Sequence, residues 1–373
     1  MDTSAPRGRA ARLLIVAPAG AVMLLGLNAG LLLMGVPVLF VTTRLAELHA
    51  PLMVFGFVGT LISLERAVAL RTRWAYAAPL LIIGGAVLAL TPLPLLIGQM
   101  LITAGLAVHV GQYRAIWARQ PMTATAVQAL GAVTAVVAAV AWCGGVPPAR
   151  LVPLLAVFLV LTIAGERWEL ARVAAPGPSA ERMLFALSTA LATTAVISLT
   201  VAVVAVPFAG ALLLALAVWL VRFDIARTTV RMSGQPRFIA VCLLAGYGWL
   251  VVAGAGWLLG GARSEGPVHD ATTHAIFLGF VITMIMAHAA LILPAVLRVR
   301  IPYHPAMYGP VALLQVSLLV RVVAGDAWGS IPSLRVGGLG AAAAMVLFAV
   351  TVVAVSVTAS VRARRAPRKE STP

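Results

Sequence analysis

Twelve apolar segments follow one another along the chain, each bounded by proline, glycine or arginine. Most are long enough to cross a bilayer core of about 30 Å at about 1.5 Å per residue. Hydrophobic residues make up 62% of the 373 residues and charged residues only 10%, which excludes an ordinary soluble domain. The pattern predicts an all-α, polytopic membrane bundle of about twelve transmembrane helices, at residues 13–40, 49–69, 76–90, 95–117, 123–142, 151–170, 183–206, 208–221, 238–259, 273–297, 303–324 and 337–361.

The positive charges test this division independently of hydropathy. With the N-terminus on the cytoplasmic side, 22 of the 27 Lys and Arg residues fall in cytoplasmic segments and 5 in outer segments. Such an excess sets the orientation of membrane proteins. We therefore predict that both termini are cytoplasmic and that the chain is a multi-pass protein of a bacterial-type inner (plasma) membrane, in contact with lipid. Because these loops account for the formal net charge of +16, it indicates no nucleic-acid partner.

The series of spans is not interrupted by a soluble domain or a low-complexity stretch, so residues 1–373 are predicted to form a single membrane domain. The longest non-apolar segment, at 172–182, has AAPGPSAE at its centre. We interpret it as a flexible cytoplasmic joint between two six-helix halves, roughly residues 13–170 and 183–361.

Two histidines each stand at the start of an apolar span. His49 begins HAPLMVFGFVGTLISLERAVAL, and His274 begins HAIFLGFVITMIMAHAALILPAVL. Both spans are even-numbered, so both run inward from the outer face and place the two histidines at similar depth. Ionisable groups inside a membrane are costly and indicate function, and two imidazoles on facing helices can bind the two axial faces of a flat haem. One turn further out, His269 is a weaker candidate ligand, and Asp270 could orient a ligating imidazole. Alternatively, each is an interfacial histidine at a helix start.

Three further histidines fall toward the cytoplasmic half. His288 lies about 21 Å deeper along the helix than His274, too far for the same cofactor centre. His109 and His304 also lie toward that side. Together the three could form an inner proton relay or a second metal site. Alternatively, they are separate histidines satisfied by neighbouring backbone or by water.

Two arginines near the outer face are candidate partners for a cofactor carboxylate. Arg321 lies near the outer end of span eleven at about the depth of His274, and Arg44 just precedes His49. A haem presents two carboxylates, and arginine is their natural bidentate partner. Either arginine could instead pair with Asp326 or with a lipid headgroup. The charged residues at the cytoplasmic helix ends are interpreted as anchors that pair with one another: Glu65, Arg66, Glu166, Arg167, Glu169, Arg222 and Asp224.

The string H-A-x-x-M-x-F at His49, with Met53 one turn after the histidine, resembles the second helix of the catalytic subunit of haem–copper oxidases and nitric oxide reductases. In that superfamily the helix-two and helix-ten histidines together hold the low-spin haem. Met53 is then a residue that contacts the cofactor. Its place on the same helix as His49 makes it an implausible second axial ligand.

The chain is also similar to the NnrS family, twelve-span haem- and copper-containing membrane proteins linked to bacterial nitric oxide stress. Three features carry this resemblance: H-A-x-x-M-x-F-G-F on span two, GERWELAR at the end of span six, and the histidine helix followed by Arg321 on the next span. The resemblance implies a haem, b-type by expectation, with copper as a further possible cofactor. The copper centre of the oxidases needs histidines on spans six and seven, which contain none in this sequence, so a proton-pumping oxidase is not expected.

Three hypotheses follow. The leading one is a haem-binding membrane protein with His49 and His274 as axial ligands, which handles nitric oxide or transfers electrons from an external donor. The second is a twelve-span secondary transporter without haem, a common plan for two six-helix halves. The third is a cofactor-free subunit or scaffold. Whether the chain is an enzyme of the oxidoreductase type stays open at this point.

Overall fold

The computed structural model describes residues 4–171, 177–297, 299 and 301–365, and the described chain is helical without strands. Eleven of its helices are long and apolar enough to cross a membrane, and a shorter apolar helix runs over Trp74–Ala89. Together they account for the twelve predicted spans, so the chain is a polytopic helical membrane protein. Part of the predicted joint at 172–182 lies outside the described residues.

The described helices follow one another along the chain with the following bounds. They are α1 (Ser4–Leu33), α2 (Thr43–Glu47), α3 (His49–Pro51), η1 (Leu52–Gly59), α4 (Thr60–Leu70), η2 (Trp74–Tyr76), α5 (Ala77–Ala89), α6 (Leu95–Arg119), α7 (Thr123–Cys143), α8 (Pro148–Ala171), α9 (Pro178–Ile197), α10 (Ala202–Phe223), α11 (Ala226–Thr229), α12 (Gly234–Gly260), α13 (Gly266–His274), η4 (Ala275–Ile282), α14 (Thr283–Leu297), η5 (Pro305–Met307), α15 (Tyr308–Leu319), η6 (Val320–Ala327) and α16 (Ile331–Arg365).

Several predicted boundaries are wrong. Spans ten and twelve begin at Gly266 and Ile331, several residues before the expected starts at 273 and 337, so His274 lies inside its helix and not at its start. The turn between spans seven and eight was expected at Pro207, but α9 ends at Ile197 and Pro207 lies inside α10. Proline is tolerated within membrane helices because neighbouring groups satisfy the freed backbone. The hydroxyls of Ser198 and Thr200 instead close the turn by donating to carbonyls of the preceding helix. The first span was also expected to reach residue 40, but α1 ends at Leu33.

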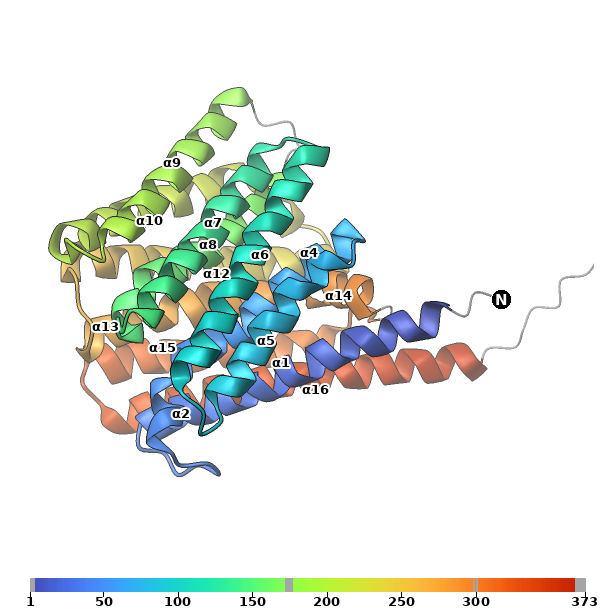
Figure 1. Cartoon of the computed structure of the whole chain (residues 1–373), viewed down its shortest axis with the longest axis horizontal. Helices are drawn as coiled ribbons and strands as arrows, with labels where there is room; N and C mark the ends of the chain where they lie inside the picture. The colour runs from blue at the N-terminus through green and yellow to red at the C-terminus, as the bar shows by residue number, and fades with distance from the viewer. Residues whose placement is uncertain (1–3, 172–176, 298, 300, 366–373) are drawn as a thin grey trace, which may run out of the picture.

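The first and last spans lie next to each other. Figure 1 shows α1 and α16 side by side, with the start of α1 and the end of α16 at the same end of the bundle. Both ends of the described chain therefore face one side of the membrane, and the arginine distribution predicts that this side is cytoplasmic.

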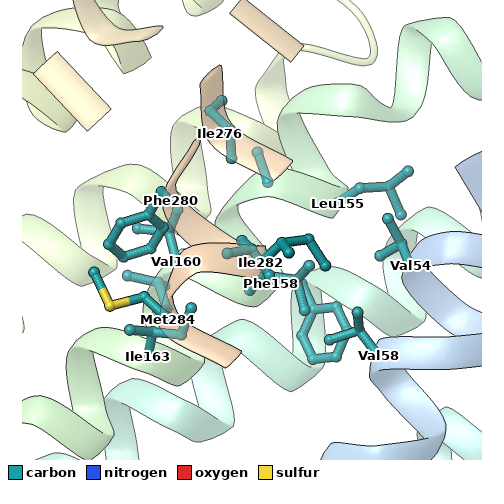
Figure 2. Packing of buried hydrophobic residues seen from close by; sticks show 14 of the residues in the cluster. Val54, Val58, Leu155, Phe158, Val160, Ile163, Ile276, Phe280, Ile282 and Met284 are labelled. Atoms are coloured by element: carbon teal, nitrogen blue, oxygen red, sulfur yellow. The ribbon is translucent and has the colours of Figure 1, made fainter. Parts of the chain in front are cut away.

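Helix α8 is the most deeply buried span and positions the rest of the core. Of its 18-residue apolar window, 78% is buried. In Figure 2, side chains of α8 pack between those of η1 on one side and those of η4 and α14 on the other: Val54, Val58, Leu155, Phe158, Val160, Ile163, Ile276, Phe280, Ile282 and Met284. The helices that carry His49 and His274 are therefore held against a common rigid partner.

Candidate functional site

A cavity of about 520 Å³ opens between α1, η1, α8, α13 with η4, and η6 with α16. Its walls are mainly apolar, with Met53 and Phe277 among them. Its polar lining residues are few: Glu47, His49, His269, Asp270, Thr273, His274 and Arg321. A mostly apolar cavity of this size with a few convergent polar groups is typical of a cofactor or small-molecule site. The two histidines predicted as haem ligands thus line one cavity.

His49 is fixed by α1. Its Nδ1 lies 2.7 Å from the carbonyl oxygen of Gly26, which can only accept, so Nδ1 carries the proton. The imidazole fits because Gly30 has no side chain: a Cβ there would stand 2.7 Å from Cε1 of His49. Within the described chain Nε2 makes no hydrogen bond, and its lone pair is available to a ligand in the cavity.

His274 is held in the same way from its own helix. Its Nδ1 lies 2.8 Å from the carbonyl oxygen of Asp270 and 3.2 Å from Oδ1 of the same residue. Both oxygens accept, so this imidazole also carries its proton on Nδ1 and keeps the Nε2 lone pair. The predicted role of Asp270 as an orienting residue thus has a geometric basis.

Arg321 lines the cavity but is already engaged. It makes a bidentate ion pair with Asp270, at 2.8 Å from Nε to Oδ2 and 2.7 Å from Nη2 to Oδ1, and Nη1 lies 3.0 Å from the sulfur of Met34. Its partner is therefore Asp270 and not Asp326, the alternative that the sequence left open. Arg321 fixes Asp270, and Asp270 in turn orients His274.

Arg44 and Met53 occupy different places. Arg44 is not among the residues that line the cavity; its guanidinium donates to the carbonyls of Thr91 and Leu93 in the turn between α5 and α6. This contact ties α2 to the neighbouring hairpin. Met53 lines the cavity, and its thioether lies against α1 where Gly26 leaves room.

The remaining histidines are separate from one another. His269 lines the cavity, with Nδ1 2.9 Å from the carbonyl of Arg263. His109 is fully buried and donates to Gln112 at 2.6 Å. His304 accepts from the backbone N–H of Ala306.

His288 belongs to a buried polar cluster near the other end of the bundle. Arg167 donates to its Nε2 at 3.0 Å and makes a bidentate contact with Asp224, at 2.7 and 3.1 Å. The Asp224 carboxylate also accepts from the hydroxyl of Tyr247 at 2.7 Å. His109, His288 and His304 thus each have different partners, which agrees with the alternative of three separate histidines. Among the described residues no group of three or more His, Cys, Asp and Glu side chains could hold a metal ion.

Three stretches of π-helix coincide with the cavity, and sequence reasoning missed them. η1 begins three residues after His49, η4 directly follows His274, and η6 contains Arg321. π-Helical turns are rare in proteins as a whole, and those that occur are often found at functional sites. The two histidine helices share His-Ala followed by Gly-Phe-Val, but η6 does not, so the sequence carries no common signal for the three stretches.

These features define the class of the molecule: a polytopic helical membrane protein with a histidine-lined cavity between its second and tenth spans. A family model described as a domain of unknown function (DUF8744) matches residues 12–357, so the chain belongs to that family. The comparisons with curated proteins and with solved structures give no match.

Proposed function

We propose that this protein binds a haem in the cavity and that His49 and His274 are its axial ligands. The observation that carries the proposal is the shared state of the two imidazoles. Each donates a hydrogen bond from Nδ1–H to a backbone carbonyl, and each keeps the Nε2 lone pair beside the same cavity. Histidine ligands are commonly fixed by such a hydrogen bond through the other ring nitrogen.

The rest of the cavity fits a flat, largely apolar group. Val58, Leu159 and Phe277 supply apolar walls, and Gly30 leaves space beside the His49 ring. The polar residues Asp270 and Arg321 lie on the same cavity, where Asp270 keeps the His274 ring in place. Exclusion of water by such walls favours a bound cofactor over a hydrated pore.

The function we propose is membrane electron transfer with an external donor. A bound haem, b-type by expectation, would supply one-electron chemistry. A haem bound by both imidazoles would have no open axial position, which favours electron transfer over binding of a gas. A role in nitric oxide handling rests on the resemblance to NnrS proteins, and it would require one of the two imidazoles to leave its place.

The test is the reduced-minus-oxidised visible spectrum of the protein purified from haem-replete cells. We expect a sharp low-spin α band that disappears in both His49→Ala and His274→Ala. His304→Ala is the matched control, since that imidazole caps η5 away from the cavity and its loss should leave the band unchanged. A colourless wild-type protein would overturn the proposal and make a haem-free transporter the better interpretation. Nitric oxide titration of the reduced protein then separates the two haem functions.

A further inference from the structure

A second cavity of about 300 Å³ lies between the start of α12 and the start of α15. Its lining consists of Ser233, Gly234, Arg237, Val241, Tyr303 and Tyr308. Both helices begin on the side where the chain's ends lie, because α12 and α15 belong to the odd-numbered spans nine and eleven. This cavity therefore opens at the predicted cytoplasmic surface, away from the histidine-lined cavity.

The polar side chains of this cavity have no hydrogen-bond or ion-pair partner in the described part of the chain. Ser233 precedes α12 without using its hydroxyl as a cap. The guanidinium of Arg237 and the hydroxyls of Tyr303 and Tyr308 likewise make no hydrogen bond or ion pair with a described residue. Four donor side chains thus line one cavity without a hydrogen-bond acceptor among the described residues.

The charge around the cavity is positive. Residues 225–237 contain Arg227, Arg231 and Arg237 but no acidic residue. The nearest carboxylate before them in the sequence, Asp224, forms an ion pair with Arg167. The positive charge of this cavity therefore favours an anionic ligand.

An aromatic wall fixes the two tyrosines. Phe238 packs against Tyr303 with ring centroids 5.9 Å apart and against Tyr308 edge-to-face at 5.0 Å. Tyrosines with one apolar and one polar end gather where lipid chains meet headgroups. The hollow thus offers donors for a charged head and, at Val241, an apolar wall that continues toward the membrane interior.

We propose that this cavity binds a phosphate group at the cytoplasmic surface, with Arg237 pairing the charge and the two tyrosines donating hydrogen bonds. Its two possible sources are an anionic phospholipid of the inner leaflet and free phosphate. Basic pockets between membrane helices on this side commonly hold lipid headgroups. The proposal is independent of the haem.

Native mass spectrometry of the full-length protein in detergent tests the site. We expect phosphatidylglycerol to stay bound in preference to phosphatidylcholine, and Arg237→Gln to weaken its retention about tenfold or more. Arg231→Gln removes the same charge from the turn just before α12, outside the cavity lining, and should change retention less than twofold. Tyr303→Phe, which keeps the aromatic wall, should weaken it by a smaller factor.

Competition between inorganic phosphate and the bound lipid distinguishes the two sources of the phosphate group. Millimolar inorganic phosphate that displaces the lipid in the wild type but not in Arg237→Gln identifies a site for free phosphate. Retention of the lipid under the same conditions identifies a headgroup site. Equal losses in Arg237→Gln and Arg231→Gln would overturn the proposal. So would equal binding of the two lipids together with no effect of millimolar phosphate on either. Thermal melting of each variant in detergent identifies any loss that comes from unfolding.

Discussion

Replacement of Gly30 by alanine tests how closely α1 shapes the His49 site. The new Cβ would stand 2.7 Å from Cε1 of His49, 3.1 Å from Nδ1 and 3.3 Å from Nε2. Carbon atoms in contact normally lie about 3.5–4.0 Å apart. The imidazole must therefore move by about 1 Å, and the 2.7 Å bond from Nδ1 to the Gly26 carbonyl cannot survive that movement.

The size of the effect follows from these two changes. Overpacking of a filled site costs about 1–3 kcal/mol, and the loss of a hydrogen bond about 0.5–1.5 kcal/mol. Both costs lower the stability of the folded protein. We expect Gly30→Ala to lower haem affinity because the displaced His49 ring no longer holds Nε2 in a fixed place, and the loss of such an orienting contact costs about 10- to 100-fold in affinity. The assay is the intensity of the low-spin α band per protein, followed during titration of the haem-depleted protein with haem.

The control is the same substitution on the same helix. Gly20 has no atom within 4 Å of a Cβ added to it, so Gly20→Ala should keep the full α band. The reasoning is refuted if Gly30→Ala and Gly20→Ala give the same haem affinity and the same spectrum. It would mean that the His49 ring does not depend on the space that α1 leaves for it.

Three further predictions concern the ion pairs and the orientation. Arg167→Ala leaves the buried carboxylate of Asp224 without its counter-ion, and we expect it to lower stability by about 3–5 kcal/mol, seen as a lower Tm in detergent. Asp270→Asn weakens the orientation of the His274 ring and should reduce haem affinity about 10- to 100-fold while leaving some low-spin band, as measured by haem titration. In a cysteine-free background of intact cells, Ser264→Cys should react with an impermeant maleimide and Ser179→Cys should not; the reverse labelling would contradict the predicted orientation.

The span count could be read from the sequence because each span must be apolar along its whole length in lipid. The turn between spans seven and eight was wrongly predicted at Pro207 for the same reason, because uniformly apolar sequence does not show where one span ends. Hydropathy is nearly uniform from residue 183 to residue 221, so proline was the only visible breaker there. The actual turn depends on the hydroxyls of Ser198 and Thr200, which bond locally to backbone carbonyls.

The candidate site was predicted in its members but not in its connections. His49 and His274 were placed together from span parity, because alternate spans run in the same direction and a histidine at the start of each reaches a similar depth. Sequence alone did not reveal that Arg321 is bound by Asp270, since Asp326 lies closer to it along the chain. The choice between the two carboxylates depends on how α13 and η6 pack.

The sequence by itself therefore determined the class of the protein, the number of its spans and the pair of histidines at one end of the bundle. These depend on hydrophobicity, charge and helix direction, which are properties of single segments. Only the tertiary structure decided that Gly26 and Gly30 of α1 receive the His49 ring, that π-turns accompany the cavity and that Arg167 joins Asp224 to His288. Those features depend on contacts between different helices, so they are decided by how the helices pack and not by any single segment.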